Sequence, residues 1–425
     1  MAILSALLSV TDMRADDFIA GADCSHLGFF ERHGIVYKDG GNRKDAFEIL
    51  KQGGLTCARL RVFTSNATQA AADPYNFGNT LEDTLSLAVR AKAAGLRLLL
   101  DFHYSDSWAD PGKQTKPASW SHLTFPQLEQ RMRSYSSNCI SEFRAAGASP
   151  DYAQVGNEII GGLLWPDGRV GGVYDTPQQW SQLGRLLSAA VRGIHDASEG
   201  APPQIIIHID RGGDWSGTRW FFDNLAQQPV AFDIIGESYY AWWHGDLADL
   251  SHCLTNTAQR YAKPVLIVET AFPWTNSTPV LNLPATPAGQ IAYVATIAKV
   301  VRKLPAGMGR GIVWWGAEYV GTPGYNLAGF EGRSFFDAGA NALPVVKAMG
   351  QLSAPLRIDA TLNDQDLTLM WPFSGAGLSC VTSTGLAASS VWLPVTNNIQ
   401  ITNAMFDVSL PRDANHRRFF RLQGE

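Results

Sequence analysis

Two glutamates stand at the ends of short apolar runs, and their chemistry is the first clue to what this chain does. Glu158 closes the run 152–158, Tyr-Ala-Gln-Val-Gly-Asn-Glu, and Glu269 closes the run 265–269, Val-Leu-Ile-Val-Glu. Such runs can be buried as strands of a parallel β/α barrel, in which catalytic groups lie at the C-terminal ends of the strands. Two carboxylates that face one pocket from different strands are what cleavage of a glycosidic bond requires.

The neighbours of the two glutamates predict different roles for them. Apolar surroundings would desolvate Glu158 and raise its pKa, as a general acid needs, and the amide of Asn157 could bind a sugar 2-hydroxyl. Glu269 must stay ionised to act as a nucleophile, so it needs hydrogen-bond donors. Either Tyr239 or Tyr240, after the sixth predicted strand, could supply a hydroxyl.

Two arginines on the second predicted strand could supply positive charge. Arg59 and Arg61 alternate with Leu60 and Val62, so both arginine side chains lie on one face of the strand. Solvation at the surface is the ordinary explanation of such a pair. Inside a barrel they would need carboxylate partners, and we expect Arg61 to be the fixed charge beside Glu269.

Polar residues also follow the third and fifth predicted strands. Residues 101–114 read Asp-Phe-His-Tyr-Ser-Asp-Ser-Trp-Ala-Asp-Pro-Gly-Lys-Gln, and residues 208–210 read His-Ile-Asp. These groups suit hydrogen bonding to sugar hydroxyls. The alternative is a metal-dependent barrel hydrolase or isomerase with His26, His103 and His208 as ligands, but no H-x-H or H-E-x-x-H motif supports it. We therefore expect neither a metal nor a cofactor.

Aromatic residues are abundant, with 13 Trp, 12 Tyr and 20 Phe. Most must pack in the core, and a few tryptophans are expected to line a sugar cleft, because flat rings stack on sugar C–H faces. The candidates near predicted loops or strand ends are Trp108, Trp120, Trp165, Trp242, Trp243 and Trp315.

The elements that would position these residues alternate along the chain. Strands are expected at 18–22, 57–62, 96–102, 152–155, 204–209, 232–235, 265–268 and 311–315. Helices are expected at 44–52, 80–94, 125–146, 177–194, 247–261 and 287–304, with an N-cap at Asn79-Thr80 and a stop at Gly95. Eight such strands predict an α/β chain folded as a (β/α)8 TIM barrel over residues 18–352.

The sequence pattern at the two ends of the chain differs from that of the barrel region. Residues 356–425 show short alternating runs separated by Gly, Ser, Asn and Pro, which predict a small antiparallel β-sandwich-like accessory domain, either a stability or spacer module or a carbohydrate-binding one. Residues 1–17 begin with an apolar stretch that resembles part of a signal peptide without its basic start. They are either a remnant of that signal or a disordered N-terminus, and we expect a secreted or periplasmic protein.

The composition of the chain limits the classes of molecule that it can bind. The net charge is −5 without a basic block, which argues against nucleic acid, and no apolar run reaches the length of a membrane span. The five cysteines show no C-x-x-C or zinc-type spacing, so we expect mostly buried free thiols, with one bridge allowed. A monomer that acts on a neutral polysaccharide is the expectation.

The motifs together resemble the arabinogalactan endo-β-1,4-galactanases, glycoside hydrolase family 53, in the clan of retaining (β/α)8 glycosidases. The matching segments are 21–25, 58–62, 101–114, 154–158, 164–166, 208, 238–240, 243–245 and 268–270. The resemblance implies that Glu158 is the acid/base, that Glu269 is the nucleophile, and that β-1,4-galactan side chains of pectin are cleaved internally. It places four side chains beside the sugar in subsite −1: Arg61, His103, Asn157 and His208. Other expected substrate contacts are Asp106, Trp108, Asp210, Tyr239, Tyr240, Trp243 and Trp315.

Several positions depart from the family pattern, and all surround the expected cleft and not the two glutamates. They are Ile160, Gly161, Glu237, Ala241 and Glu318. Glu237 could recognise a substrate hydroxyl or a basic group, or it could form a buried pair with an arginine. Another glycan of the same clan, such as a β-glucan or mannan, and a non-catalytic sugar-binding barrel remain the alternatives.

Overall fold

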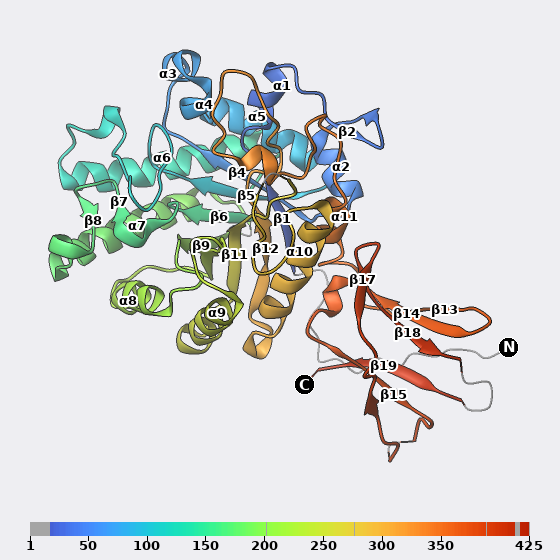
Figure 1. Ribbon diagram of the computed structural model, residues 1–425. Coiled ribbons are helices and arrows are strands. Elements are labelled where there is room, and N and C mark those ends of the chain that lie inside the picture. The colour runs from blue at the N-terminus through green and yellow to red at the C-terminus, as the bar shows by residue number, and fades with distance from the viewer. Residues whose placement is uncertain (1–17, 201, 276, 388, 413–416, 425) are drawn as a thin grey trace.

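Eight parallel strands close into a barrel in the computed structural model, which describes residues 18–200, 202–275, 277–387, 389–412 and 417–424 (Figure 1). Around the barrel the strands are β1 (Ile19–Asp23), β4 (Cys57–Val62), β5 (Arg97–Phe102), β6 (Tyr152–Val155), β9 (Gln204–Ile209), β10 (Ile234–Ser238), β11 (Val265–Thr270) and β12 (Gly309–Trp314). The predicted TIM barrel is confirmed. Two small hairpins decorate it: β2 (Lys38–Asp39) with β3 (Asn42–Arg43), and β7 (Gly162–Leu163) with β8 (Gly168–Arg169).

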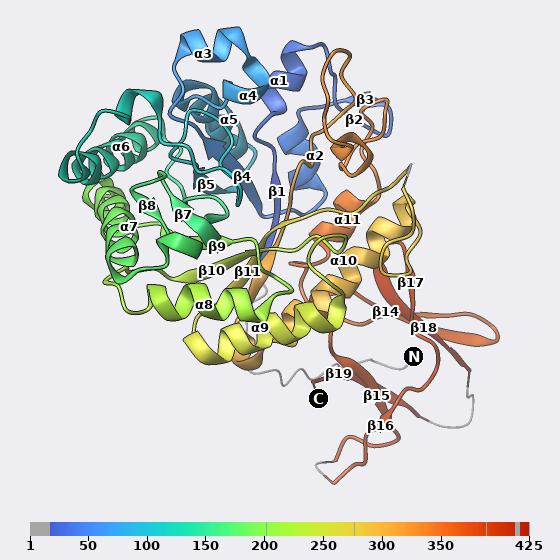
Figure 2. The same ribbon diagram turned by 60° about the vertical axis from the view of Figure 1, so that its left-hand side comes forward.

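Helices surround the barrel in both views of the molecule (Figures 1 and 2). They are α1 (Leu27–Arg32), α2 (Ala46–Gln52), α3 (Ala67–Ala72), α4 (Pro74–Phe77), α5 (Leu81–Ala93), α6 (Phe125–Ala145), α7 (Pro177–Ala197), α8 (Trp215–Leu225), α9 (Leu247–Tyr261), α10 (Pro287–Arg302) and α11 (Val345–Gly350). Thr80 caps α5 by accepting from the Asp83 amide, and Gly95 follows the helix with a positive φ of 83°, as predicted. Asn79 is not part of that cap, because its side chain bonds Ser25 and Arg61.

The sixth barrel strand shows why one predicted boundary is wrong. The apolar pattern placed this strand at 232–235, but β10 runs from Ile234 to Ser238. Asp233 stays outside the strand and accepts from the Ile205 amide at 2.7 Å. The polar residues Glu237 and Ser238 extend the strand because both side chains find buried hydrogen-bond partners.

The inward face of the barrel changes character along its axis. Alternation gives each strand one inward row. The N-terminal part of these rows forms a separate apolar cluster of nine residues: Ile19, Cys57, Leu99, Tyr152, Ile206, Ile234, Leu266, Val268 and Val313. Further along the same rows come buried polar residues, including Asp23, Arg59, Asp101, Gln154, His208 and Ser238. The apolar layer therefore closes the barrel below a polar mouth.

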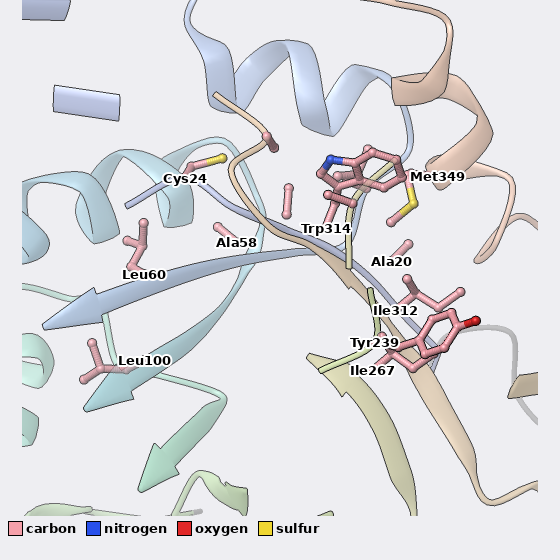
Figure 3. Packing of buried hydrophobic residues seen from close by; sticks show 14 of the residues in the cluster. Ala20, Cys24, Ala58, Leu60, Leu100, Tyr239, Ile267, Ile312, Trp314 and Met349 are labelled. Atoms are coloured by element: carbon pink, nitrogen blue, oxygen red, sulfur yellow. The ribbon is translucent and has the colours of Figure 1, made fainter. Parts of the chain in front are cut away.

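A larger hydrophobic cluster fills the space between strands and helices. Figure 3 shows part of it, including Ile267 and Ile312 of neighbouring strands and Tyr239. Trp314 is fully buried there, and its indole donates to the backbone carbonyl of Arg333. These outward side chains fix the strands against the helices and leave the inward row free for the site.

Two antiparallel sheets follow the barrel, as the sequence predicts. One has the order β13 (Asp359–Leu362), β14 (Asp366–Trp371), β18 (Met405–Pro411), β17 (Gln400–Thr402). The other has the order β16 (Leu393–Pro394), β15 (Ser379–Ser383), β19 (Phe419–Gln423). They lie beside α10 and α11 (Figure 2), where Phe406 belongs to the same buried cluster as the barrel residues and Lys299 lies over its ring.

All five cysteines lie in the described part of the chain and are buried free thiols. Among the described residues, no helix has both the length and the apolar character to cross a membrane. The signal-peptide prediction falls on residues 1–17, which lie outside the described residues.

Candidate active site

Arg59 stands at the centre of the polar barrel mouth and is 1% exposed. Its guanidinium donates to Asp23 at 2.7 Å and to Asp101 at 2.9 Å, and it lies 2.9 Å from Glu269 Oε1. It also donates to Gln154 Oε1 at 3.2 Å. A planar group with five N–H donors can serve all of these acceptors at once. One fixed positive charge thus joins side chains from β1, β4, β5, β6 and β11.

Both oxygens of Glu269 have a donor. Arg59 approaches Oε1, and the hydroxyl of Tyr240 donates to Oε2 at 3.0 Å. The side chain is 5% exposed. Charge-assisted bonds to both oxygens stabilise the ionised carboxylate in a desolvated place.

One predicted partner of Glu269 was wrong. Arg61 does not reach it, since its guanidinium donates to Asn79 at 3.0 Å and contacts His26 and Asp23. Arg59 takes the expected role because it is two residues, and hence one inward position, closer to the barrel floor.

Of the two tyrosines, only Tyr240 faces the carboxylate. Tyr239 is fully buried in the hydrophobic cluster of Figure 3, and its hydroxyl donates to the backbone carbonyl of Gly245. Adjacent residues at a strand end point to opposite sides, so one tyrosine faces the mouth and the other packs outside the barrel.

Glu158 faces the same mouth from the end of β6. Its backbone is left-handed, with φ 49° and ψ 51°. Gly156 also has a positive φ of 86°, and the two left-handed positions on either side of Asn157 interrupt the alternation of the strand, so Asn157 and Glu158 both turn inward. Asn157 accepts from Arg59 at 2.9 Å, and Glu158 Oε1 accepts from the hydroxyl of Ser238 at 2.6 Å. Ser238 and Tyr240, two positions apart, therefore hold one carboxyl group each.

The two carboxyl groups share their electrostatic surroundings unequally. Burial raises the pKa of Glu269 to about 7 despite the opposing effect of Arg59. Burial raises the pKa of Glu158 well above its ordinary value, and the nearby charges of Glu269 and Asp210 raise it further. Since Arg59 acts most directly on Glu269, a single proton shared by the pair resides on Glu158.

The histidines near the mouth are bound by protein groups. His103 contacts Asp101 through Nε2 at 3.0 Å and accepts from the Ala109 amide through Nδ1. His208 contacts Ser238 through Nε2 at 2.8 Å. His26 Nε2 lies 2.9 Å from the Tyr75 carbonyl, and its Nδ1 lies 2.8 Å from Arg61. Their polar atoms orient neighbouring groups, and within the described residues no three His, Cys, Asp or Glu side chains group as metal ligands.

Aromatic rings line the mouth on the side of Arg61. Its guanidinium stacks over Trp108 at 4.2 Å and lies 5.7 Å from the Trp315 ring. The two tryptophan rings lie 6.1 Å apart. Trp243, beside Tyr240, is 64% exposed and offers a free ring face, whereas Trp120 is 3% exposed and belongs to the core.

The two predicted aspartates differ in their surroundings. Asp106 is tied into the loops, since it accepts from Thr64 and from the Ala118 amide. Asp210 is 6% exposed and pairs with Arg211 at 2.7 Å, while its Oδ1 meets no hydrogen-bond partner among the described residues. Burial raises the pKa of Asp210 to about 6, with Arg211 opposing.

Glu237 and Glu318 are not hydrogen-bonded to Glu269; each has other partners among the described residues. Glu237 points out of the barrel, where it accepts from the Arg211 amide at 3.0 Å and the Thr218 hydroxyl at 3.0 Å. Within the described parts of the chain it pairs with no arginine side chain, and it does not enter the mouth. Glu318 is fully buried and accepts from the His26 amide at 2.7 Å, and burial raises its pKa to about 8.

The sequence interpretation missed three groups that build the mouth: Asp23, Gln154 and Ser238. Each is a polar residue within an apolar strand, at the inward position of its row. That signal was present, since an uncharged amide such as Gln154 in a buried strand must find a partner.

The barrel and its pair of inward glutamates, held by Arg59, Tyr240 and Ser238, define the class: this is a (β/α)8 glycoside hydrolase. The sequence model of glycosyl hydrolase family 53 matches residues 19–349. The chain therefore belongs to glycosyl hydrolase family 53, as the sequence motifs indicated.

Similar proteins of known sequence or structure support this family assignment. An arabinogalactan endo-β-1,4-galactanase of Cellvibrio japonicus is 34% identical over 368 residues, 81% of this chain and 93% of that protein. One of Thermothelomyces thermophilus is 34% identical over 309 residues, 69% of this chain and 88% of that protein. The family 53 catalytic domain of Ignisphaera aggregans is 30% identical with a TM-score of 0.72, covering 84% of this chain and 100% of that one. A fungal β-1,4-galactanase structure is 31% identical with a TM-score of 0.69, covering 78% and 98%.

Proposed function

We propose that this enzyme is a retaining endo-β-1,4-galactanase that hydrolyses the galactan and arabinogalactan side chains of pectin. The main observation behind this proposal is that the two inward carboxyl groups of a family 53 barrel have different hydrogen-bond partners and different charged neighbours. Glu269 has Arg59 and Tyr240 as donors, while Glu158 is desolvated and faces acidic neighbours. Relatives named as arabinogalactan endo-β-1,4-galactanases support the choice of glycan.

The mechanism follows from these two environments. Glu269 attacks the anomeric carbon as Glu158 gives its proton to the leaving oxygen, and a galactosyl ester forms on Glu269. Glu158, now ionised, takes a proton from water as the water attacks that carbon and the ester bond breaks. Two displacements retain the β-configuration, which predicts that the carboxyl groups lie about 5–5.5 Å apart.

The remaining residues are assigned to substrate binding by their places. Asn157 faces the sugar between the two glutamates and suits the 2-hydroxyl. Trp108, Trp315 and the exposed ring of Trp243 offer faces to successive sugars. The other proposed contacts of the bound glycan are Arg61, His103, Asp210 and Tyr240. Tyr239 and Asp106 act through the loops they hold, and His208 acts through Ser238.

The first experiment is hydrolysis of purified β-1,4-galactan beside β-glucan, mannan and xylan, using wild type and Glu269→Gln. Glu237→Gln is the matched control, because it changes a buried glutamate of the neighbouring strand that points away from the mouth. We expect galactan oligosaccharides from wild type and the control and none from Glu269→Gln, and NMR should show the β-anomer as the first product.

Other outcomes have distinct meanings. Activity on a different glycan alone would overturn the galactan assignment and leave the two-carboxylate mechanism in place. An α-anomer as first product would overturn retention. Binding of galactan without hydrolysis of any glycan in the panel would point to a sugar-binding barrel.

We also infer that the enzyme acts as a monomer on a polymer outside the cytoplasm, since a polysaccharide substrate is too large to be taken up intact. The C-terminal sheets then serve as a stabilising module. Light scattering of the purified enzyme and fractionation of the producing cells check these points.

A further inference from the structure

A line of hydrogen bonds runs among the inward side chains of the barrel mouth to Glu158. Ser238 Oγ donates to Glu158 Oε1 at 2.6 Å, and His208 Nε2 lies 2.8 Å from the same hydroxyl oxygen. On the other side of the imidazole, the Glu158 amide donates to His208 Nδ1 at 3.3 Å and Gln154 Nε2 lies 3.1 Å away. His208 and Ser238 are both fully buried, so bulk water does not compete for these bonds.

Arg59 and the backbone amide of Glu158 together fix the direction of the bonds in this line. A guanidinium only donates, so the side-chain oxygen of Gln154 faces Arg59 and its NH2 group faces Asp101 and His208. The hydrogen of a backbone amide cannot move, so the Glu158 amide requires Nδ1 of His208 to be an acceptor. Asn157 Oδ1, 3.2 Å from Nδ1, already accepts from Arg59 and does not need that hydrogen.

The tautomer of His208 then determines the direction in which the hydroxyl of Ser238 donates its hydrogen. With Nδ1 as acceptor, the single hydrogen of the neutral ring lies on Nε2 and is donated to Ser238 Oγ. Burial and the charge of Arg59 lower the pKa of His208 well below its ordinary value, so the ring stays neutral. Ser238 can then give its own hydrogen only to Glu158 Oε1.

We propose that Ser238, oriented by His208, is a positioning residue that keeps Oε1 of Glu158 as an acceptor, so that the transferable proton is always carried by Oε2. The proposal rests on the proposed role of Glu158 as acid/base. In the first step the Oε2 proton passes to the glycosidic oxygen as the C1–O bond breaks. In the second step Oε2 takes a proton from water, and Ser238 keeps its own hydrogen throughout.

The charged and polar groups around Glu158 predict opposite effects for two variants. Glu269 on β11 and Asp210 after β9 raise its pKa, whereas Ser238 on β10 and Arg59 on β4 lower it. Removing the serine hydroxyl should raise the pKa of Glu158, because the ionised form loses a donor. Removing the charge of Asp210 should lower the same pKa.

The test is the pH dependence of kcat/KM on the glycan that the enzyme hydrolyses. For Ser238→Ala we expect the basic limb of the profile to move up by about one pH unit. Loss of one hydrogen bond to the ionised carboxylate should raise its pKa by about that amount. For Asp210→Asn we expect it to move down. Ser136→Ala is the matched control, because Ser136 is a fully buried serine of α6 whose hydroxyl bonds Tyr104 and Met132.

The serine should also affect the second chemical step. With an aryl galactoside that has a good leaving group, the first step needs no acid and the second still needs ionised Glu158. At pH 7 we expect Ser238→Ala to release a burst of phenol followed by turnover about tenfold slower than wild type. Ser238→Cys, with a similar shape and a weaker donor, should lie between the two and serves if the alanine variant does not fold.

The outcomes separate this inference from the function on which it rests. Azide should restore turnover of the aryl galactoside by Glu158→Ala; absence of rescue would overturn Glu158 as acid/base. Rescue together with an unmoved basic limb in Ser238→Ala and Ser238→Cys would overturn the serine role alone. A basic limb that shifts the same way in Ser238→Ala and Asp210→Asn would also overturn it, since disturbed packing would then explain both.

Discussion

The guanidinium of Arg59 touches carboxylates from three other strands, so its loss affects both the charge of Glu269 and the packing of the mouth. Arg61 is equally buried but serves Asn79, His26 and the Trp108 ring. Two arginines of the same strand therefore offer a matched comparison.

Arg59→Lys should raise the pKa of Glu269, because one ammonium cannot reach Glu269, Asp23 and Asp101 together. We expect the acid limb of kcat/KM to move up by about one pH unit, together with a loss of roughly 3–5 kcal/mol of unfolding free energy from the poorly paired buried carboxylates. Arg61→Lys should leave the acid limb in place. Kinetics across pH and urea denaturation measure both, and a shift of the acid limb in Arg61→Lys alone would reverse the assignment.

At this scale the sequence predicted the two strand-end glutamates, Asn157 and a tyrosine partner of Glu269, but neither the arginine beside Glu269 nor the serine beside Glu158. Strand ends and residue types are visible in a sequence, whereas the depth of a side chain along the barrel axis is not. Arg59 and Arg61 share a face, and only the register of β4 against β1 and β5 decides which one reaches Glu269.

Strand β10 serves two layers of the molecule at once. Ser238 and, just beyond the strand, Tyr240 turn into the mouth, while Glu237 turns out toward α8 and α9. Burial raises the pKa of Glu237 well above its ordinary value, so it is neutral in the folded protein over a wide pH range. Its hydrogen bonds to Arg211 and Thr218 hold the loop and helix that follow β9.

Glu237 predicts a pH-dependent stability. Its folded pKa exceeds its unfolded pKa, so its contribution is complete below the unfolded value, about 4.3, and is lost as pH rises toward the folded value. As the pH rises from 5 to 8, the unfolding free energy of Glu237→Gln should therefore increase relative to that of wild type. Glu237→Leu should be less stable than Glu237→Gln by roughly 1–3 kcal/mol at both pH values, because Arg211 and Thr218 lose an acceptor. Urea unfolding at the two pH values checks this, and a changed substrate range in either variant would contradict the outward placement.

Most elements were predictable because their apolar periods are long and their caps are explicit. The helix α8 was missed since it is short and begins within a Gly-Gly-Asp turn, where Asp214 caps it. The left-handed backbone at Glu158 also could not be predicted, because nothing in Asn-Glu distinguishes it from a strand that continues.

At the scale of the whole molecule, the C-terminal sheets and the barrel share a buried cluster. Phe406 is 3% exposed, its ring lies 4.9 Å from that of Phe373, and Lys299 of α10 covers it. The change of texture after residue 352 predicted these antiparallel strands, but their attachment to α10 and α11 depends on contacts distant in sequence.

Phe406→Ala should cost about 3–5 kcal/mol, since a large ring leaves a packed junction. We expect a lower unfolding temperature by calorimetry and an unchanged kcat/KM at 25 °C, because Phe406 contacts no residue of the mouth. Phe420→Ala, which removes a half-buried ring stacked with Arg418, is the matched control with a smaller effect. A fall in kcat/KM while the barrel is still folded would show that the sheets support the site.

The arrangement around Arg59 has a consequence for the timing of the reaction cycle. Three carboxylates and two arginines leave the mouth one negative charge in excess while Glu158 holds its proton: Asp23, Asp101, Glu269, Arg59 and Arg61. Under the proposed mechanism, the ester on Glu269 cancels that excess. The repulsion that kept a proton on Glu158 then falls, so the group stays ionised after it has given its proton to the leaving oxygen and can take one from water. The substrate itself resets the acid to a base, and no part of the protein needs to move.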